Sequence, residues 1–183
     1  VGYVGGMGRQ EGLQYLLRAA RHIVQVRRRA DVQFGLVGGG SELEALRRLA
    51  VELGIADYVT FTGRVPDAAL LAMLNTADVC VNSDEFNPMN DKSTMNKIME
   101  YMALGKPIVQ FDLTEGRFSA EGASLYARPN DAIDMAEKIL ELLDDPARRA
   151  AMGAMGRARV ETVLAWPHEA PRLLAAYAAL WAG

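Results

Sequence analysis

The chain has 183 residues, of which 50% are hydrophobic and 23% are charged. This length and composition fit one globular domain and exclude a disordered chain. The formal net charge is −3, so no global basic field is available and we expect no nucleic-acid partner. The single cysteine, Cys80, excludes an internal disulfide and fits a cytoplasmic protein. Because a strand-like run begins at Val1 without a Met, we expect a piece of a longer protein.

Short apolar runs alternate with amphipathic segments along the whole chain. We expect strands at residues 1–4, 32–37, 58–61, 79–81, 107–111 and 124–127. Helices are expected near 13–24, 42–53, 66–77, 93–104, 131–143, 146–163 and 167–182. This alternation predicts the α/β class, with a doubly wound parallel sheet of about six strands. Ligands of such sheets bind at the carboxyl ends of the strands.

The first strand-to-helix turn carries glycines and an arginine. Gly5 and Gly6 allow close approach of a ligand to the backbone, and Arg9 can hold a phosphate. The spacing is not that of a dinucleotide-binding fingerprint, which makes NAD a poor candidate. The alternative is a plain tight turn with Arg9 in solvent.

Two later turns lie at the same edge of the predicted sheet. The run 38–40 is all glycine and, with Ser41, could cradle an anion. We favour a structural interpretation, in which Ser41 is a helix N-cap that pairs with Glu44 in a capping box. After the third strand, Gly63 allows close approach to the backbone. We therefore predict that Arg64 and Val65 contact a ligand, with a plain loop as the alternative.

The segment from Asp91 to Val109 is the most informative. Met and Ile residues form an apolar stripe, and Ser93, Lys97 and Glu100 lie on a polar stripe beside it. Glu100 is expected about two turns into the helix, where its carboxylate can accept hydrogen bonds from the two hydroxyls of a ribose. Ser93 and Thr94 are expected in the first turn, where free N–H groups favour an anion, and Lys97 adds a charge for a diphosphate. The alternative is an N-capping Ser93 followed by an exposed Glu–Lys face.

The chain resembles the C-terminal, donor-binding domain of a bacterial GT-B glycosyltransferase of family 4, a group 1 glycosyl transferase. The resemblance covers essentially the whole chain. It rests on residues 1–5, 36–43, 59–65 and, most specifically, 100–109, which read EYMALGKPIV. The sequence of residues 93–100 resembles that of bacterial family members linked to surface and exopolysaccharide assembly.

The family motif has two glutamates separated by seven residues, and Glu100 matches the second, which binds the ribose in the family. The first falls at Lys92, a mismatch, and Asp91 one residue earlier is our candidate for the catalytic carboxylate that contacts the sugar. The basic residues of the family near the first strand and helix are replaced by Tyr3 and Glu11. We expect Arg9 or Lys97 to compensate.

The resemblance implies retaining transfer from a UDP- or GDP-sugar to a lipid-linked or saccharide acceptor. It implies no metal and no further cofactor. The partners would be the donor and the chain's own N-terminal acceptor domain, absent from residues 1–183, and the location would be cytoplasmic, at the inner membrane surface if the missing domain binds there. Two alternatives stay open, a sugar-nucleotide epimerase of the same architecture and a non-catalytic nucleotide-binding module.

Overall fold

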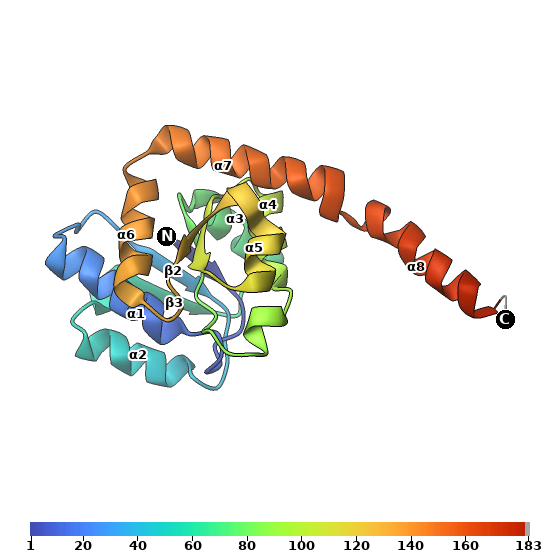
Figure 1. The fold of residues 1–183 in the computed structure, drawn as a ribbon. Helices are drawn as coiled ribbons and strands as arrows, with labels where there is room; N and C mark the ends of the chain where they lie inside the picture. The colour runs from blue at the N-terminus through green and yellow to red at the C-terminus, as the bar shows by residue number, and fades with distance from the viewer. Residues whose placement is uncertain (182–183) are drawn as a thin grey trace.

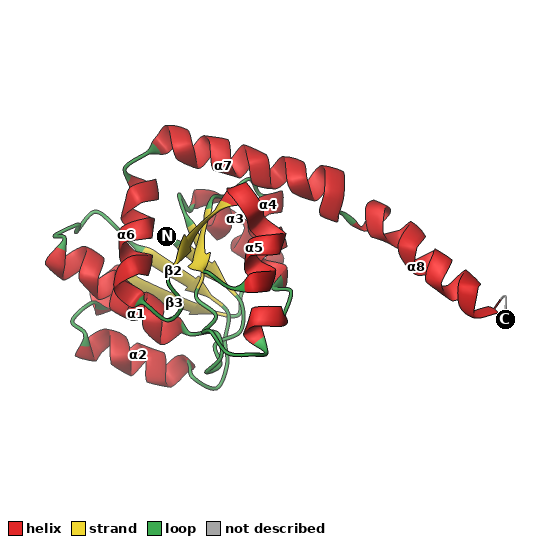
Figure 2. Cartoon of the chain, in the orientation of Figure 1, coloured by secondary structure: helices red, strands yellow, loops and turns green. Residues whose placement is uncertain are grey.

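The fold is described from a computed structural model, which covers residues 1–181. Its centre is a six-stranded, all-parallel sheet in the order β3-β2-β1-β4-β5-β6 (Figures 1 and 2). The strands are β1 (Gly2–Val4), β2 (Phe34–Val37), β3 (Val59–Gly63), β4 (Cys80–Asn82), β5 (Ile108–Phe111) and β6 (Ser124–Ala127). This order confirms the predicted doubly wound α/β fold.

Helices cover both faces of the sheet. They are α1 (Leu13–Arg21), α2 (Leu43–Glu52), α3 (Asp67–Thr76), α4 (Asn96–Ala103), α5 (Thr114–Ala120), α6 (Ala132–Leu143), α7 (Pro146–Arg159) and α8 (Trp166–Trp181). Short helical turns lie at His22–Val26, Ala56–Tyr58, Asn90–Lys92, Glu121–Ala123 and Val160–Leu164. The expected last residue of the final helix, Ala182, lies outside the described residues.

Side chains of alternate strand residues pack into two separate hydrophobic cores. Tyr3 of β1 and Val109 of β5 belong to the core beneath α1, α2 and α6. Val4 and Ile108, their neighbours in sequence, belong to the core beneath α3 and α4. This alternation is the two-residue period of a strand that is buried on both faces.

Helix α4 begins later than the sequence predicts. Its first residue is Asn96, because Ser93 and Met95 have extended backbone and a short turn at Asn90–Lys92 comes before them. Glu100 is therefore the fifth residue of α4, little more than one turn from its start. The predicted end of the helix is confirmed. Gly105 has a φ of 65°, and the N–H groups of Gly105 and Lys106 donate to Met102 and Tyr101 oxygens at 2.9 Å, a Schellman motif.

Two expectations about local structure are wrong. Helix α5 occupies a region in which the sequence suggested only loop. Ser41 is not an N-cap, because α2 has Glu42 in that position with no side-chain capping bond. Glu44 pairs with Arg47 at 2.9 Å in place of the expected capping box.

Helix α8 projects from the body of the domain (Figure 1). None of its residues is buried, and Trp181 is 83% exposed. Among residues 1–181 we find no helix whose length and hydropathy would let it cross a membrane.

Candidate functional site

The strand order reverses between β1 and β4, a point at which doubly wound sheets usually have a ligand crevice. The two strands pair in register only at Gly2 and Cys80, and no further ladder pair joins them. Crevices of this kind at the carboxyl edge of a doubly wound sheet are the usual ligand sites. The residues that line this edge therefore define the candidate site.

The Tyr101 hydroxyl bridges the two strands where their ladder stops. The Val4 N–H donates to this oxygen at 2.9 Å, and the hydroxyl lies 3.3 Å from the Val81 carbonyl oxygen, to which it can donate. Tyr101 is fully buried, and burial raises the pKa of its phenol well above the ordinary value. The phenol is therefore a neutral structural bridge, and it comes from the residue directly after Glu100.

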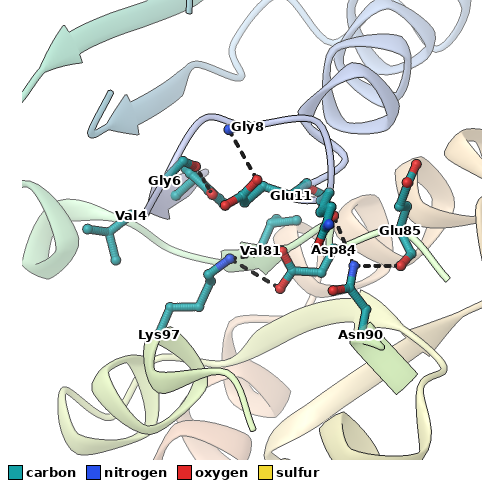
Figure 3. A network of polar contacts seen from close by, with 12 residues as sticks. Val4, Gly6, Gly8, Glu11, Val81, Asp84, Glu85, Asn90 and Lys97 are labelled. Carbon is teal, nitrogen blue, oxygen red and sulfur yellow. Dashed lines mark hydrogen bonds and ion pairs between the residues drawn. The ribbon is translucent and has the colours of Figure 1, made fainter. Parts of the chain in front are cut away.

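The glycine turn after β1 is already occupied by an internal carboxylate. The Gly8 N–H donates to Glu11 Oε2 at 3.1 Å (Figure 3), and a Cβ atom on Gly6 would lie 2.8 Å from Glu11 Oε1. The Gly5 N–H donates to Val37 O at 3.1 Å. The turn thus brings negative charge to the place where the sequence suggested a phosphate.

The ammonium of Lys97 lies in the crevice and is paired with a buried acid. Its Nζ is 3.1 Å from Asp84 Oδ1 and 3.2 Å from Oδ2, and it lies 5.1 Å from the centre of the Tyr3 ring. Figure 3 shows Lys97 pointing toward Asp84. The side chains of Lys97 and Asp84 are 11% and 3% exposed. Burial raises the pKa of the Asp84 carboxyl above its usual value, while the Lys97 ammonium acts in the opposite direction.

Hydrogen bonds fasten the loop after β4 to the β1–α1 turn. Ser83 Oγ donates to Glu11 O at 2.9 Å, and the Glu85 N–H donates to Gln10 O at 3.0 Å. Asn90 Nδ2 donates to the carbonyl oxygens of Gln10 and Glu85, at 3.0 and 2.8 Å. These bonds fix the loop that carries Asp84, and therefore fix Asp84 relative to the crevice.

The polar residues before α4 are engaged by neighbouring elements. Ser93 Oγ donates to Met89 O at 2.7 Å, and Thr94 Oγ1 donates to Glu115 Oε1 at 2.7 Å. Asp91 receives the Thr114 N–H at 2.8 Å and the Thr114 hydroxyl at 3.1 Å, so both of its oxygens are used at the start of α5. The contact between Asp91 and a sugar stays a prediction, and these two bonds hold the carboxylate against the start of α5.

Glu100 differs from these residues. It is exposed on α4, and its carboxylate has no hydrogen bond or ion pair within residues 1–181. Lys97 lies three residues earlier on the same helix, so the two side chains project from neighbouring positions on its surface. The structure therefore places one free carboxylate and one largely buried ammonium about one turn apart on α4.

The other predicted residues are spread along this edge. Arg9 is exposed and borders a hollow between α1 and α2 that Gln14 and Glu42 also line. Arg64 is exposed after β3, and Val65 packs partly against the core beneath α3 and α4. Neither arginine forms an ion pair in the part of the chain that the structure describes.

The glycines after β2 have a structural role. Gly38 has a φ of 130°, and a Cβ atom there would lie 1.9 Å from Gly5 O. The Glu42 N–H donates to Met7 O at 2.9 Å, which holds this loop against the β1–α1 turn. This packing supports the structural interpretation of the run 38–40.

Further polar groups lie near the crevice. Asn82 Oδ1 at the end of β4 and Gln110 Oε1 on β5 are buried acceptors without a donor among residues 1–181. Unpaired buried acceptors are rare, which marks this edge as a polar site. No group of three or more His, Cys, Asp or Glu side chains in the described residues could hold a metal ion.

Sequence reasoning missed Asp84, Glu11 and Tyr101 as site residues. The charge of Asp84 directly after a buried strand was an available signal, because acids in that place lie at the ligand edge. The sequence indicates Glu11 only as a mismatch to the family motif. Nothing in the sequence pattern indicated the role of Tyr101, since a buried hydroxyl at this spacing is compatible with ordinary core packing.

Comparison with known proteins leads to the same family as the resemblance in the sequence. Residues 1–145 match the family model for glycosyl transferases group 1. The chain is 30% identical over 167 residues to a GDP-mannose-dependent monoacylated alpha-(1-6)-phosphatidylinositol monomannoside mannosyltransferase of Corynebacterium glutamicum, which covers 90% of this chain and 43% of the relative. It is 34% identical over 155 residues to a GDP-mannose-dependent alpha-(1-6)-phosphatidylinositol monomannoside mannosyltransferase of Mycobacterium tuberculosis, over 81% of this chain and 40% of the relative.

A solved structure resembles the whole described fold. Sucrose-phosphate synthase from Thermosynechococcus elongatus superimposes with a TM-score of 0.82 at 29% identity, over 99% of this chain and 45% of that one. The chain thus spans less than half the length of each of these three proteins. It belongs to the group 1 glycosyl transferases and has the fold of the C-terminal domain of a GT-B enzyme.

Proposed function

We propose that this chain binds the nucleotide-sugar donor of a retaining glycosyltransferase. The observation that carries the proposal is the pair on α4, in which the free carboxylate of Glu100 and the largely buried ammonium of Lys97 lie about one turn apart. A carboxylate suits the two hydroxyls of a ribose, and an ammonium suits a diphosphate. The donor is a UDP- or GDP-sugar. The names of the two mannosyltransferase relatives favour GDP.

The transfer replaces one bond at the anomeric carbon by another. An acceptor hydroxyl oxygen bonds to this carbon on the face from which the diphosphate departs, and the bond from the carbon to the phosphate oxygen breaks. The hydroxyl proton passes to an oxygen of the leaving diphosphate. Lys97 stabilises the charge that develops on that group, because a fixed cation in a water-poor crevice requires little reorganisation during the reaction.

Asp91 is our candidate for contact with the hydroxyls of the transferred sugar. Its carboxylate is held by Thr114, and each of its oxygens keeps a further lone pair that can accept from the sugar. The acceptor is lipid-linked or a saccharide in surface or exopolysaccharide synthesis, and the chain's own N-terminal domain supplies its site. The reaction takes place in the cytoplasm, at the inner membrane surface when the acceptor is a lipid.

The ribose contact of Glu100 is the part to test first. Glu100→Ala should weaken binding of UDP or GDP about tenfold or more in isothermal titration calorimetry, since hydrogen bonds to a charged group contribute about 1.5–3 kcal/mol. The loss should disappear with the 2′,3′-dideoxy nucleotide, which lacks both hydroxyls.

Glu52→Ala is the matched control, because Glu52 is an exposed glutamate at the end of α2 with no ion pair among residues 1–181. It should leave nucleotide affinity unchanged. If Glu100→Ala also leaves the affinity unchanged, or weakens the natural and the dideoxy nucleotide equally, the assignment of Glu100 to the ribose is wrong.

A further inference from the structure

The ion pair between Lys97 and Asp84 is unusual for its depth. Asp84 is 3% exposed and lies near Glu11, whose charge opposes ionisation of the Asp84 carboxyl. Removing two charges from water is costly, and a buried ion pair is often no more stabilising than an apolar pair of the same volume. Stability alone is therefore a weak explanation for this pair.

The geometry restricts the ammonium on more than one side. Both oxygens of Asp84 accept from Nζ, and the Tyr3 ring lies 5.1 Å from it. The Tyr3 ring is itself fixed, because its hydroxyl donates to Gly6 O at 2.6 Å. A lysine side chain without these partners would turn its ammonium toward water, where it is better hydrated.

The two residues come from different elements. Asp84 belongs to the loop after β4, and Lys97 belongs to the first turn of α4. In Figure 3 the lysine reaches from its helix toward the acid. The bonds of Ser83 and Glu85 to the β1–α1 turn hold the loop in place, so the position of Asp84 is set independently of α4.

We infer that Asp84 is a positioning residue that keeps the charged ammonium of Lys97 at the β1–β4 crevice, where it meets the diphosphate of the donor. The inference rests on the proposed function and deepens it. Asp84 does not itself touch the donor, and its effect passes through Lys97. Preorganisation of a cation before binding is favourable, because the donor then does not have to order a flexible side chain.

The test compares a nucleoside diphosphate with the matching monophosphate on the complete protein. The ratio of the two affinities isolates the terminal phosphate, because base, ribose and first phosphate are common to both. Asp84→Asn should lower this ratio about tenfold, the size expected for a lost charge-assisted contact. Lys97→Met should lower it to the same extent.

The double variant Asp84→Asn with Lys97→Met decides whether the two residues act together. If Asp84 acts through Lys97, the double variant should have the same ratio as Lys97→Met alone. A merely structural Asp84 would lower the melting temperature and leave the ratio unchanged. A competing Asp84, which withholds Lys97 from the phosphate, would give a higher ratio in Asp84→Asn. Either of the last two results overturns the inference.

Asp84→Glu provides a second variant if Asp84→Asn does not fold. It keeps the charge but moves the carboxylate by one methylene, so its ratio should fall below that of the wild type. An unchanged ratio in a folded Asp84→Glu would contradict positioning. If the wild type binds neither UDP nor GDP, the proposed function itself fails; if it binds one of them with a ratio independent of Asp84, only this inference fails.

Discussion

The buried hydroxyl of Tyr101 replaces a backbone acceptor between β1 and β4. Tyr101→Phe would leave the Val4 N–H buried without a partner. We expect the free energy of unfolding to fall by about 1–3 kcal/mol, the desolvation cost of such a group. Denaturant unfolding measures this change.

Tyr177→Phe is the control for this substitution. Tyr177 is 49% exposed on α8, and its hydroxyl has no hydrogen bond within residues 1–181. Its loss should change the free energy of unfolding by less than about 0.5 kcal/mol. Equal effects of the two substitutions would contradict the bridging role of Tyr101.

Asp84 also makes the stability of the protein depend on pH. Its pKa in the folded state is raised above the ordinary value of 3.8, mainly by burial and also by Glu11, against the effect of Lys97. Between these two pKa values the folded state binds more protons than the unfolded state, so the contribution of Asp84 to stability decreases as pH rises. Below both values and above both values this contribution is constant.

The difference in free energy of unfolding between wild type and Asp84→Asn isolates this contribution. It should fall as pH rises from about 4 through the folded-state pKa and then level off. Urea unfolding of both proteins at a series of pH values checks this. A difference that rises with pH in that interval would show that the folded state favours the ionised form of Asp84.

Sequence reasoning about single residues succeeded where a residue type has one main use at its position. Glycine after a helix is of this kind, and Gly105 has the expected left-handed backbone. It failed where partners come from distant parts of the chain. Asp91 could not be assigned to Thr114, which is 23 residues away, because such a pairing depends on the packing of whole loops.

Among the elements, the β1–α1 turn depends on a glycine that approaches another backbone. Gly12 has a φ of 61°, and a Cβ atom there would lie 2.0 Å from Ser83 O. Gly63 has nearly the same backbone, with a φ of 70°, but a Cβ atom there would meet nothing within 4 Å. A side chain at Gly63 would therefore add backbone strain alone, whereas a side chain at Gly12 would add both strain and a steric collision.

Alanine at each position tests this difference. Gly63→Ala should cost about 1–2 kcal/mol, the strain of a left-handed residue with a side chain. Gly12→Ala should cost clearly more, because the turn must also move away from the loop after β4. Equal losses in thermal unfolding would show that the two loops are not tightly packed.

The elements themselves were largely predictable, and their exact limits were not. All six strands were expected near their observed positions. A strand buried on both faces, such as β1, reads as continuous apolar sequence, whereas β3 alternates between partly buried and exposed residues. Helix α5 was missed because it is short and contains Gly116 in a polar stretch, with no clear apolar period. The start of α4 was misplaced because Ser93 resembles an N-cap, whereas its hydroxyl bonds back to Met89.

At the scale of the molecule, α8 contributes little to the stability of the domain. It has no buried residue, and its large apolar side chains, among them Leu174 and Trp181, face outward. A chain that ends at Ala165 should keep its melting temperature within about 2 °C, because no core is lost. Differential scanning calorimetry measures the shift.

Met152 of α7 provides the contrast, because it is 4% exposed. Met152→Ala should cost about 2–5 kcal/mol through the lost core contacts and the cavity. If removal of α8 were as destabilising as this substitution, the helix would have to contribute to the core more than its exposure indicates.

The architecture could be predicted as a whole because strand and helix alternate without interruption. That pattern permits few topologies other than a doubly wound sheet, and the order of the six strands agrees with it. The location of the site followed from the fold, since the carboxyl edge is set by topology. Its charge balance did not, because it depends on which partners Glu11 and Asp84 contact in the folded protein.

The bridge made by Tyr101 also gives the protein an internal spectroscopic probe. The amide proton of Val4 is bound to a side-chain oxygen carried by α4, whereas neighbouring amides of the sheet are bound to backbone oxygens. Its nuclear magnetic resonance frequency therefore reports the position of α4 relative to the sheet. Since Glu100 directly precedes Tyr101, a nucleotide that displaces this helix would shift the Val4 signal without any added label.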